Sequence, residues 1–229
     1  MYKAILFDLD NTLLLPITPL TDKLTALQAE GIALFSTDSA REAQRQAELW
    51  TARQILHELE TNTRMDDDVF LENVLQCYRS CAAVQGEEAN TLIYAAVTDR
   101  AKSIPVPDVY RLLDVLKEKY VLGIVSNNSA RVRTVLDEFE LTPYFQVITI
   151  SAEVGLEKPN PLIMMETCSK IQVNPSECLY VGDHPFDVLC ADRAGMDCVW
   201  VDRGVFLESD LPAAPKKSIC TLTELQFLC

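Results

Sequence analysis

The sequence predicts an α/β fold: a doubly wound parallel sheet with a smaller helical domain inserted after its first strand. Short runs rich in β-branched and aromatic residues alternate with helical stretches along the second half of the chain. These runs lack an apolar–polar alternation, which is typical of strands buried on both faces of a parallel sheet. Roughly ninety mostly helical residues follow the first run, too many for a loop in a compact domain.

The alternating part of the chain predicts five strands joined by helices, as in right-handed βαβ units. The expected strands are residues 2–7, 120–125, 146–150, 178–181 and 198–201. The expected helices between them are residues 109–119, 129–140, 161–171 and 186–194.

The long insertion predicts a second, helical domain. We expect one helix near Leu20 and a long one capped by Asp38 or Ser39 that runs to about residue 60. Asp66 to Asp68 would open a third helix to about residue 84, and a fourth would run from after Gly86 to about residue 101. The expected domains are therefore residues 1–14 with 105–229, and residues 15–104.

The composition limits the classes of partner. The chain has 34 acidic and 20 basic residues, a net charge of −14, which argues against nucleic acid or an anionic membrane surface as a partner. No apolar stretch is long enough to span a bilayer, and no signal-peptide pattern precedes the first strand. The eight cysteines are scattered without a CxxC pair, so we expect reduced thiols in a cytoplasmic protein. The sequence does not distinguish a monomer from a homodimer.

Polar side chains follow four of the five expected strands. In an open α/β sheet, ligands bind beyond the carboxyl ends of the strands, so these residues form the candidate site. They are Asp8, Asp10, Thr12, Ser126, Asn127, Lys158, Asp183 and Asp187.

Four motifs in order carry a family resemblance. The segment DLDNT, the pair Ser126-Asn127, Lys158 with the following Pro159, and the segment GDHPFD resemble the four motifs of the haloacid dehalogenase (HAD) superfamily. The resemblance covers the whole chain. It implies a Rossmann-like core domain that carries the chemistry and a small helical cap domain in the first cap position.

The resemblance also implies a magnesium-dependent phosphatase acting on a small phosphate monoester. Asp8 would be the nucleophile that forms an aspartyl-phosphate, and Asp10 would protonate the leaving alcohol and then activate water. The implied metal ligands are the Asp8 side chain, the Asp10 backbone carbonyl and Asp183, with Asp187 as a ligand or just outside the ligand set. Lys158 would compensate charge between Asp8 and the phosphate.

The remaining motif residues are implied to hold phosphate oxygens or the loop. These are the Ser126 hydroxyl, the Asn127 backbone N–H and the Thr12 side chain. Four carboxylates against one lysine give 1 − 4 = −3 when all are ionised, which would repel a phosphate dianion. Mg²⁺ fits this need because it prefers oxygen ligands and retains water.

Other functions compete with this interpretation. A dehalogenase needs neither an acid for its halide leaving group nor a metal, so Asp10 and the acidic cluster argue against it. A phosphomutase shares every core motif and transfers the phosphoryl group to a second hydroxyl in place of water. A non-catalytic binding or regulatory protein could also retain the fold. Sugar phosphates, nucleotides, phosphoglycolate and acyl-sugar phosphates all remain open as substrates.

Overall fold

The computed structural model describes residues 2–99 and 102–227, which divide into two compact units. One unit contains the chain up to Leu15 and from Ile104 onward, and the other spans Pro16–Ser103. Within the described ranges, no helix has both the length and the apolar character needed to cross a membrane.

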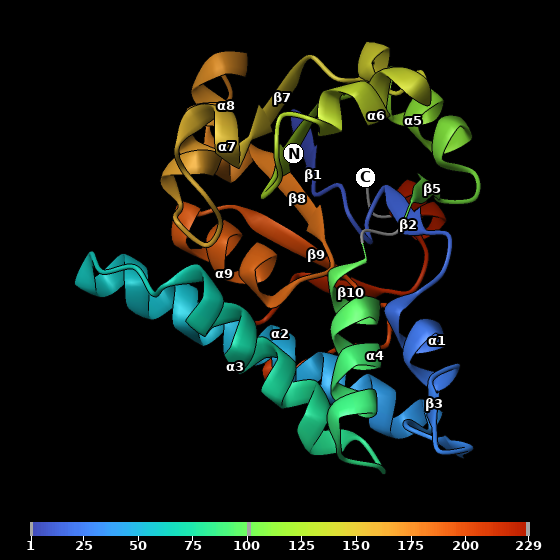
Figure 1. The fold of residues 1–229 in the computed structure, drawn as a ribbon. Helices are drawn as coiled ribbons and strands as arrows, with labels where there is room; N and C mark the ends of the chain where they lie inside the picture. The colour runs from blue at the N-terminus through green and yellow to red at the C-terminus, as the bar shows by residue number, and fades with distance from the viewer. Residues whose placement is uncertain (1, 100–101, 228–229) are drawn as a thin grey trace. The chain divides into compact units, whose positions relative to one another are not determined.

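The first unit is built on a parallel sheet of six strands in the order β10-β9-β8-β1-β6-β7 (Figure 1). This confirms the predicted parallel α/β sheet and places the first strand at its centre, hydrogen-bonded to β6 and β8. The edge strand β10 was not predicted, because its three residues are too few to show a pattern. The strands are β1 (Ala4–Phe7), β6 (Val121–Ser126), β7 (Val147–Ile150), β8 (Cys178–Gly182), β9 (Asp197–Val201) and β10 (Lys217–Ile219).

Helices cover both faces of this sheet (Figure 1). Successive strand residues point to opposite faces, so Ile5 and Phe7 of β1 join one core cluster with α5 and α6. The helices α8 and α9 pack on the other face. The helical segments of this unit are α5 (Val109–Lys117), α6 (Val132–Glu138), η1 (Thr142–Tyr144), α7 (Ser151–Val154), α8 (Leu162–Ile171), η2 (Pro175–Glu177), α9 (Pro185–Ala194), η3 (Glu208–Asp210) and η4 (Leu222–Phe227).

The second unit is helical, with one short hairpin. Alanines at spacings of three and four on α2, namely Ala40, Ala43 and Ala47, form one face that is buried with Leu75 and Tyr78 of α3. Its elements are α1 (Leu20–Thr25), β3 (Gln28–Ala29), β4 (Ile32–Ala33), α2 (Thr37–Thr61), α3 (Asp67–Cys81) and α4 (Glu87–Thr98). Where the chain passes from one unit to the other, β2 (Leu14–Pro16) pairs with β5 (Ser103–Pro105).

Helix ends differ from the expected ones for local reasons. The cap of α2 is Ser36, whose hydroxyl accepts the Ser39 N–H while the Ser39 hydroxyl accepts the Ser36 N–H, a reciprocal capping box. Helix α6 is shorter than expected, because the Val132 N–H bonds three residues back to Ser129 and Glu140 has a positive φ of 51°. Helix α4 ends at Thr98, and its expected end at residue 101 lies outside the described residues.

Candidate active site

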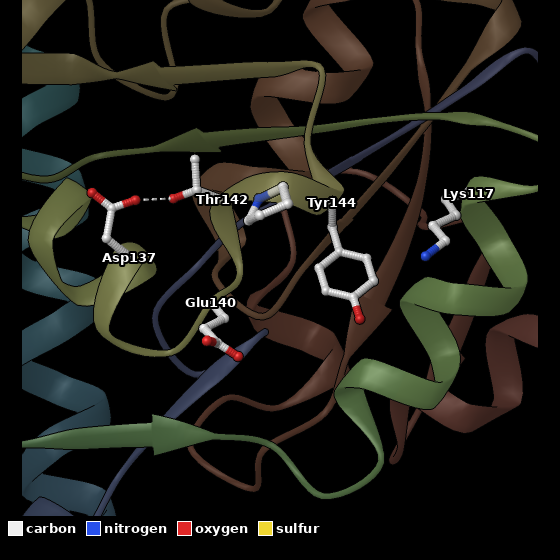
Figure 2. A pocket seen from close by; sticks show the side chains of 6 residues that line it. Lys117, Asp137, Glu140, Thr142 and Tyr144 are labelled. Atoms are coloured by element: carbon white, nitrogen blue, oxygen red, sulfur yellow. Dashed lines mark hydrogen bonds between the residues drawn. The ribbon is translucent and has the colours of Figure 1, made fainter.

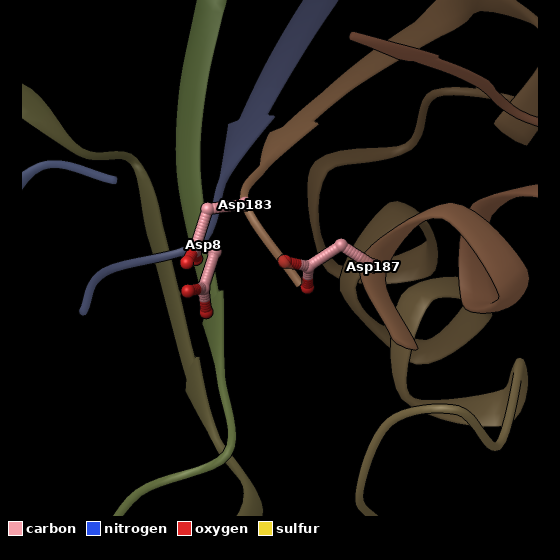
Figure 3. Close-up of side chains that lie close together, drawn as sticks. All are labelled: Asp8, Asp183 and Asp187. Carbon is pink, nitrogen blue, oxygen red and sulfur yellow. The ribbon is translucent and has the colours of Figure 1, made fainter. Parts of the chain in front are cut away.

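Three carboxyl groups meet at the carboxyl edge of the sheet. Asp8 directly follows β1, and its N–H donates to the Val181 carbonyl at 2.8 Å. Asp183 directly follows β8, and Asp187 lies in the first turn of α9. One oxygen from each of the three carboxylates lies within 4.8 Å of the other two. Figure 3 shows Asp8 and Asp183 side by side, with Asp187 reaching toward them from its helix.

Lys158 bridges two of these carboxylates from the loop before α8. Its Nζ lies 2.6 Å from Asp8 Oδ1 and 2.6 Å from Asp187 Oδ1, and the side chain is only 4% exposed. Burial opposes the charged ammonium, but Asp187 and Asp8 outweigh it and raise the Lys158 pKa. The lysine is therefore a protonated counter-ion inside the protein.

The carboxylates carry more charge than Lys158 neutralises. Three carboxylates and one ammonium sum to 1 − 3 = −2 when all are ionised. Burial raises the pKa of Asp8 to about 7, against the opposing effect of Lys158. Burial, Asp8 and Asp187 together raise the pKa of Asp183 well above its usual value. Hard oxygen donors with an uncompensated double negative charge fit a divalent cation such as Mg²⁺.

Asp187 differs from the other two carboxylates because protein donors occupy both of its oxygens. Oδ1 accepts from Lys158, and Oδ2 accepts the His184 N–H at 2.9 Å. Gly182 makes room for this arrangement, since a Cβ atom there would collide with the Asp187 carboxyl group. His184 caps α9, accepting the Phe186 N–H on Nδ1 at 3.0 Å, and burial lowers its pKa to about 4. The imidazole is therefore neutral, and its Nδ1 caps the helix.

Asp10 lies beyond the end of β1 and is exposed. Its Oδ2 accepts a hydrogen bond from Asn128 Nδ2 at 2.7 Å. Although the residue reaches solvent, the protein around the carboxyl group lowers its hydration enough to raise its pKa, against the opposing effects of Lys158 and Asn128. A raised pKa favours the protonated form that a general acid needs.

Arg203 holds the loop that follows Asp10. Its Nε donates to the Asn11 carbonyl at 2.6 Å, and its NH2 group donates to the Thr12 carbonyl at 3.2 Å. Asn11 has a φ of 55°, a left-handed conformation that asparagine tolerates better than most residues. The arginine therefore fixes this tight bend through two consecutive backbone carbonyls.

The expected phosphate-binding residues lie at the same edge. Ser126 ends β6 and is 1% exposed, and Thr12 is fully buried with its hydroxyl 3.4 Å from Asp183 Oδ1. The Asn127 side chain forms two hydrogen bonds with the Lys158 backbone, donating to its carbonyl at 2.8 Å and accepting its N–H at 2.7 Å. Asn127 therefore positions the lysine loop through its side chain. The structure brings all eight residues singled out from the sequence into one unit.

Further residues contact the site and were not among the candidates chosen from the sequence, among them Tyr180, Arg203 and Asn128. A tyrosine in an otherwise aliphatic buried strand needs a hydrogen-bond partner for its hydroxyl, which is a usable signal for Tyr180. Arg203 follows β9, so extending the strand-end rule to the fifth strand would have found it. Asn128 belongs to the polar run after β6, but its contact with Asp10 joins distant parts of the chain and has no local signature.

A separate surface hollow of about 550 Å³ lies at the opposite edge of the sheet (Figure 2). It lies near the amino ends of β6 and β7, and its charged side chains are of both signs. The Thr142 hydroxyl donates to Asp137 at 2.5 Å, and Lys117 Nζ lies 4.9 Å from the centre of the Tyr144 ring. The residues that line it are Lys117, Asp137, Glu140, Thr142, Pro143 and Tyr144. None belongs to the carboxylate cluster, so this hollow is not the candidate active site.

The chain resembles known proteins along most of its length. Residues 5–201 match the profile of a family described as haloacid dehalogenase-like hydrolase. A glyceraldehyde 3-phosphate phosphatase of Methanopyrus kandleri is 32% identical over 221 residues, which cover 92% of this chain and 88% of that protein. A solved HAD phosphatase from Thermococcus onnurineus is 26% identical, with a TM-score of 0.59 and coverage of 99% and 97% of the two chains. A 2-haloacid dehalogenase from Pseudomonas syringae pv. tomato, at 24% identity, a TM-score of 0.57 and coverage of 100% and 98%, shares the fold.

Proposed function

Since the chain belongs to the haloacid dehalogenase-like hydrolases, we propose that it is a magnesium-dependent phosphatase that hydrolyses a small phosphate monoester through an aspartyl-phosphate on Asp8. One observation carries the proposal: Lys158 Nζ lies 2.6 Å from Asp8 Oδ1 at the carboxyl edge of the sheet. Among the described residues, no hydrogen-bond donor contacts Asp8 Oδ2. That oxygen is left to attack phosphorus.

The reaction then divides between two carboxyl groups. An Asp8 oxygen attacks phosphorus while the bond to the alcohol oxygen breaks, and Asp10 gives its proton to the leaving alkoxide. Asp10, now a carboxylate, takes a proton from water as that water attacks phosphorus. The bond between phosphorus and Asp8 breaks, releasing inorganic phosphate and restoring Asp8. The raised pKa of Asp10 supports its starting role as the acid.

We assign the metal to Asp8, Asp183 and the Asp10 backbone carbonyl. Bound there, Mg²⁺ would supply positive charge that stabilises the transferring phosphoryl group. Asp187 has both oxygens engaged by Lys158 and the His184 N–H. Its proposed role is therefore to hold Lys158 in place from outside the ligand set.

Ser126, Thr12 and the backbone N–H of Asn127 are the proposed phosphate contacts. The side chain of Asn127 is already bonded to the Lys158 backbone, which leaves its N–H for the ligand. Donors of this kind position a phosphoryl group and neutralise its charge, which is most of what phosphoryl transfer requires.

For the substrate, the relative from Methanopyrus kandleri suggests a starting point, because it is named for a three-carbon phosphate ester. We propose that this chain acts on a small phosphate ester of that kind. A panel of glyceraldehyde 3-phosphate, phosphoglycolate, sugar phosphates and nucleotides, compared by kcat/KM, tests the class. A preference for nucleotides would contradict it.

The decisive experiment is hydrolysis of para-nitrophenyl phosphate by the wild type and Asp8→Asn, with and without Mg²⁺. We expect metal-dependent phosphate release, and a fall on the order of 10⁴-fold or more in the variant, the scale seen when a catalytic nucleophile is lost. Release that persists in Asp8→Asn would rule out the proposed nucleophile. No release from folded, magnesium-loaded wild type would favour a phosphomutase or a non-catalytic protein, and phosphoryl transfer between sugar hydroxyls separates these two.

The helical unit is proposed to select the leaving group. The connecting strands β2 and β5 pair with each other, and the Val106 N–H donates to the Leu13 carbonyl at 2.9 Å. The two chain ends of the α/β unit are therefore adjacent, and a short linker can replace Pro16–Ser103. We expect that variant to retain hydrolysis of aryl phosphates and to lose discrimination among the panel. Unchanged selectivity in a folded variant would overturn this role.

A further inference from the structure

We propose that Tyr180 is a positioning residue for Lys158. Its hydroxyl fixes one of the three N–H groups of the ammonium and so directs the other two toward Asp8 and Asp187. The inference rests on the proposed role of Asp8, because its effect on turnover passes through that carboxylate.

Tyr180 lies in the middle of β8 and is fully buried. Its strand neighbours Leu179 and Val181 face the core formed with α5 and α6. Strand alternation therefore points Tyr180 to the opposite face. There its hydroxyl lies 3.0 Å from Lys158 Nζ, 2.9 Å from the Val125 carbonyl oxygen and 3.2 Å from Asp187 Oδ1.

The donor and acceptor chemistry gives these contacts a direction. An ammonium has three donors and no acceptor, so Lys158 donates to the tyrosine oxygen. The tyrosine has one proton, and the nearer of its two acceptors is the Val125 carbonyl. Asp187 Oδ1 already accepts from Lys158 at the shorter distance of 2.6 Å. The result is a chain from the ammonium through the hydroxyl to the backbone of β6.

This chain fixes the rotation of the ammonium. Lys158 has three contacts for three N–H groups: Asp8, Asp187 and Tyr180. With the third N–H anchored to the sheet, Asp8 Oδ1 is held and its other oxygen faces the incoming phosphorus. Removing the hydroxyl takes an acceptor from one N–H of the ammonium and a donor from the Val125 carbonyl, and the ammonium is then free to turn. Because the phosphate contacts at Ser126 and Asn127 are untouched, we expect the loss in kcat and not in KM.

Turnover of para-nitrophenyl phosphate by Tyr180→Phe tests this, with Tyr110→Phe as the matched control. The Tyr110 hydroxyl also donates to a backbone carbonyl, that of Phe139 at 2.8 Å, away from the site. We expect kcat to fall roughly 10-fold to 100-fold in Tyr180→Phe, the scale of a misplaced reacting group. KM should stay within about twofold, and the control should keep wild-type values. An unchanged kcat, or an equal fall in the control, overturns the proposal.

A second measurement separates this inference from the proposed function, because it needs no turnover. Urea unfolding midpoints are compared for the wild type, Tyr180→Phe, Lys158→Met and the double variant. If the hydroxyl acts through Lys158, Tyr180→Phe shifts the midpoint clearly less in the Lys158→Met background, where only the loss of its bond to the Val125 carbonyl remains. Additive shifts overturn the proposal even in an active enzyme.

If Lys158→Met does not fold, the Nζ resonance of Lys158 is followed by NMR. It should move in Tyr180→Phe and stay in place in Tyr110→Phe, and a resonance unmoved by Tyr180→Phe contradicts the proposal.

Discussion

The two units of the protein differ in what they bury. The α/β unit buries three aspartates and a lysine where its strands end: Asp8, Lys158, Asp183 and Asp187. In the described part of the helical unit, every buried side chain is apolar or aromatic, and many are alanines. Among the described residues, fully buried charged side chains therefore occur only in the α/β unit. The charged side chain of Glu48 in the helical unit is partly buried, and that burial raises its pKa.

This difference separates buried residues that serve the proposed reaction from buried residues that serve helix packing. Burying a charge is unfavourable unless it is paired, and replacing a buried pair with apolar residues is often neutral or stabilising. Charges kept at the edge of a sheet are therefore better explained by function than by stability. In the helical unit, the alanine face of α2 allows close packing against α3.

The largest effect is expected from Lys158→Met, which removes the buried positive charge of the α/β unit. Asp8 and Asp187 would lose their shared counter-ion, so we expect the free energy of unfolding to fall by about 3–5 kcal/mol. Turnover should fall on the order of 10³-fold or more, because Asp8 loses its orientation. Urea unfolding and steady-state kinetics measure the two effects. Lys158→Arg is the control that keeps the charge, and a Met variant as stable as wild type would contradict the buried pair.

Asp10→Asn is expected to lower kcat without lowering the stability of the protein. Asp10 is exposed and its carboxyl has one described hydrogen bond, from Asn128. We therefore expect the free energy of unfolding to change by less than about 0.5 kcal/mol, while kcat falls roughly 10²-fold to 10⁴-fold through loss of the general acid and base. An ester with a good leaving group, such as para-nitrophenyl phosphate, should lose less in its first step than an alkyl phosphate. Equal losses for the two esters would count against the acid role.

The sequence predicted the charged interior better than the apolar one. Asp8 and Asp183 each follow a predicted strand, and Lys158 lies in the loop after a third, so the strand-end rule was enough to bring them together. The contacts that hold them could not be predicted this way. The hydrogen bonds from Asn128 to Asp10 and from Arg203 to the Asn11 carbonyl join segments distant in sequence, and nothing local in the chain specifies them.

In the helical unit, the helices could be predicted but their exact ends could not. The cap of α2 was placed two or three residues late, because Ser36, Asp38 and Ser39 can all begin a helix. Only the reciprocal bonds between Ser36 and Ser39 decide among them. The short hairpin β3–β4 was missed because strands of two residues carry no period.

Magnesium binding is expected to depend on pH, since protons and metal compete for the same carboxylates. Burial raises the pKa of Asp8 to about 7 in the metal-free protein, so below that pH the cation must displace a proton. One displaced proton weakens the apparent Mg²⁺ affinity roughly tenfold from pH 8 to pH 6. Isothermal titration calorimetry at the two pH values measures this.

The stability of the protein should follow the same binding. At a free Mg²⁺ concentration of about 100 times Kd, linkage predicts a gain of about 2.7 kcal/mol in the free energy of unfolding. Asp183→Asn, which removes one proposed ligand, is the control and should lose most of the gain. An affinity that is equal at pH 6 and pH 8 would place the metal away from these carboxylates.

The smallest effect is expected from Ala47→Leu in the helical unit. This substitution tests whether the apolar interior of that unit has room for a larger side chain. Ala47 is 2% exposed and shares its core cluster with Leu75 and Tyr78. Three added carbon atoms on that face must displace α3 or force strained rotamers, so we expect a loss of about 1–3 kcal/mol in the free energy of unfolding.

Arg41→Leu places the same side chain on the exposed side of α2 and should change stability by less than about 0.5 kcal/mol. Turnover of para-nitrophenyl phosphate by folded Ala47→Leu should remain within about twofold of wild type, since no group of the carboxylate cluster is altered. A stabilised Ala47→Leu would mean that the alanine face leaves space that a larger side chain fills, and the contrast between the two interiors would then be one of packing density as well as charge.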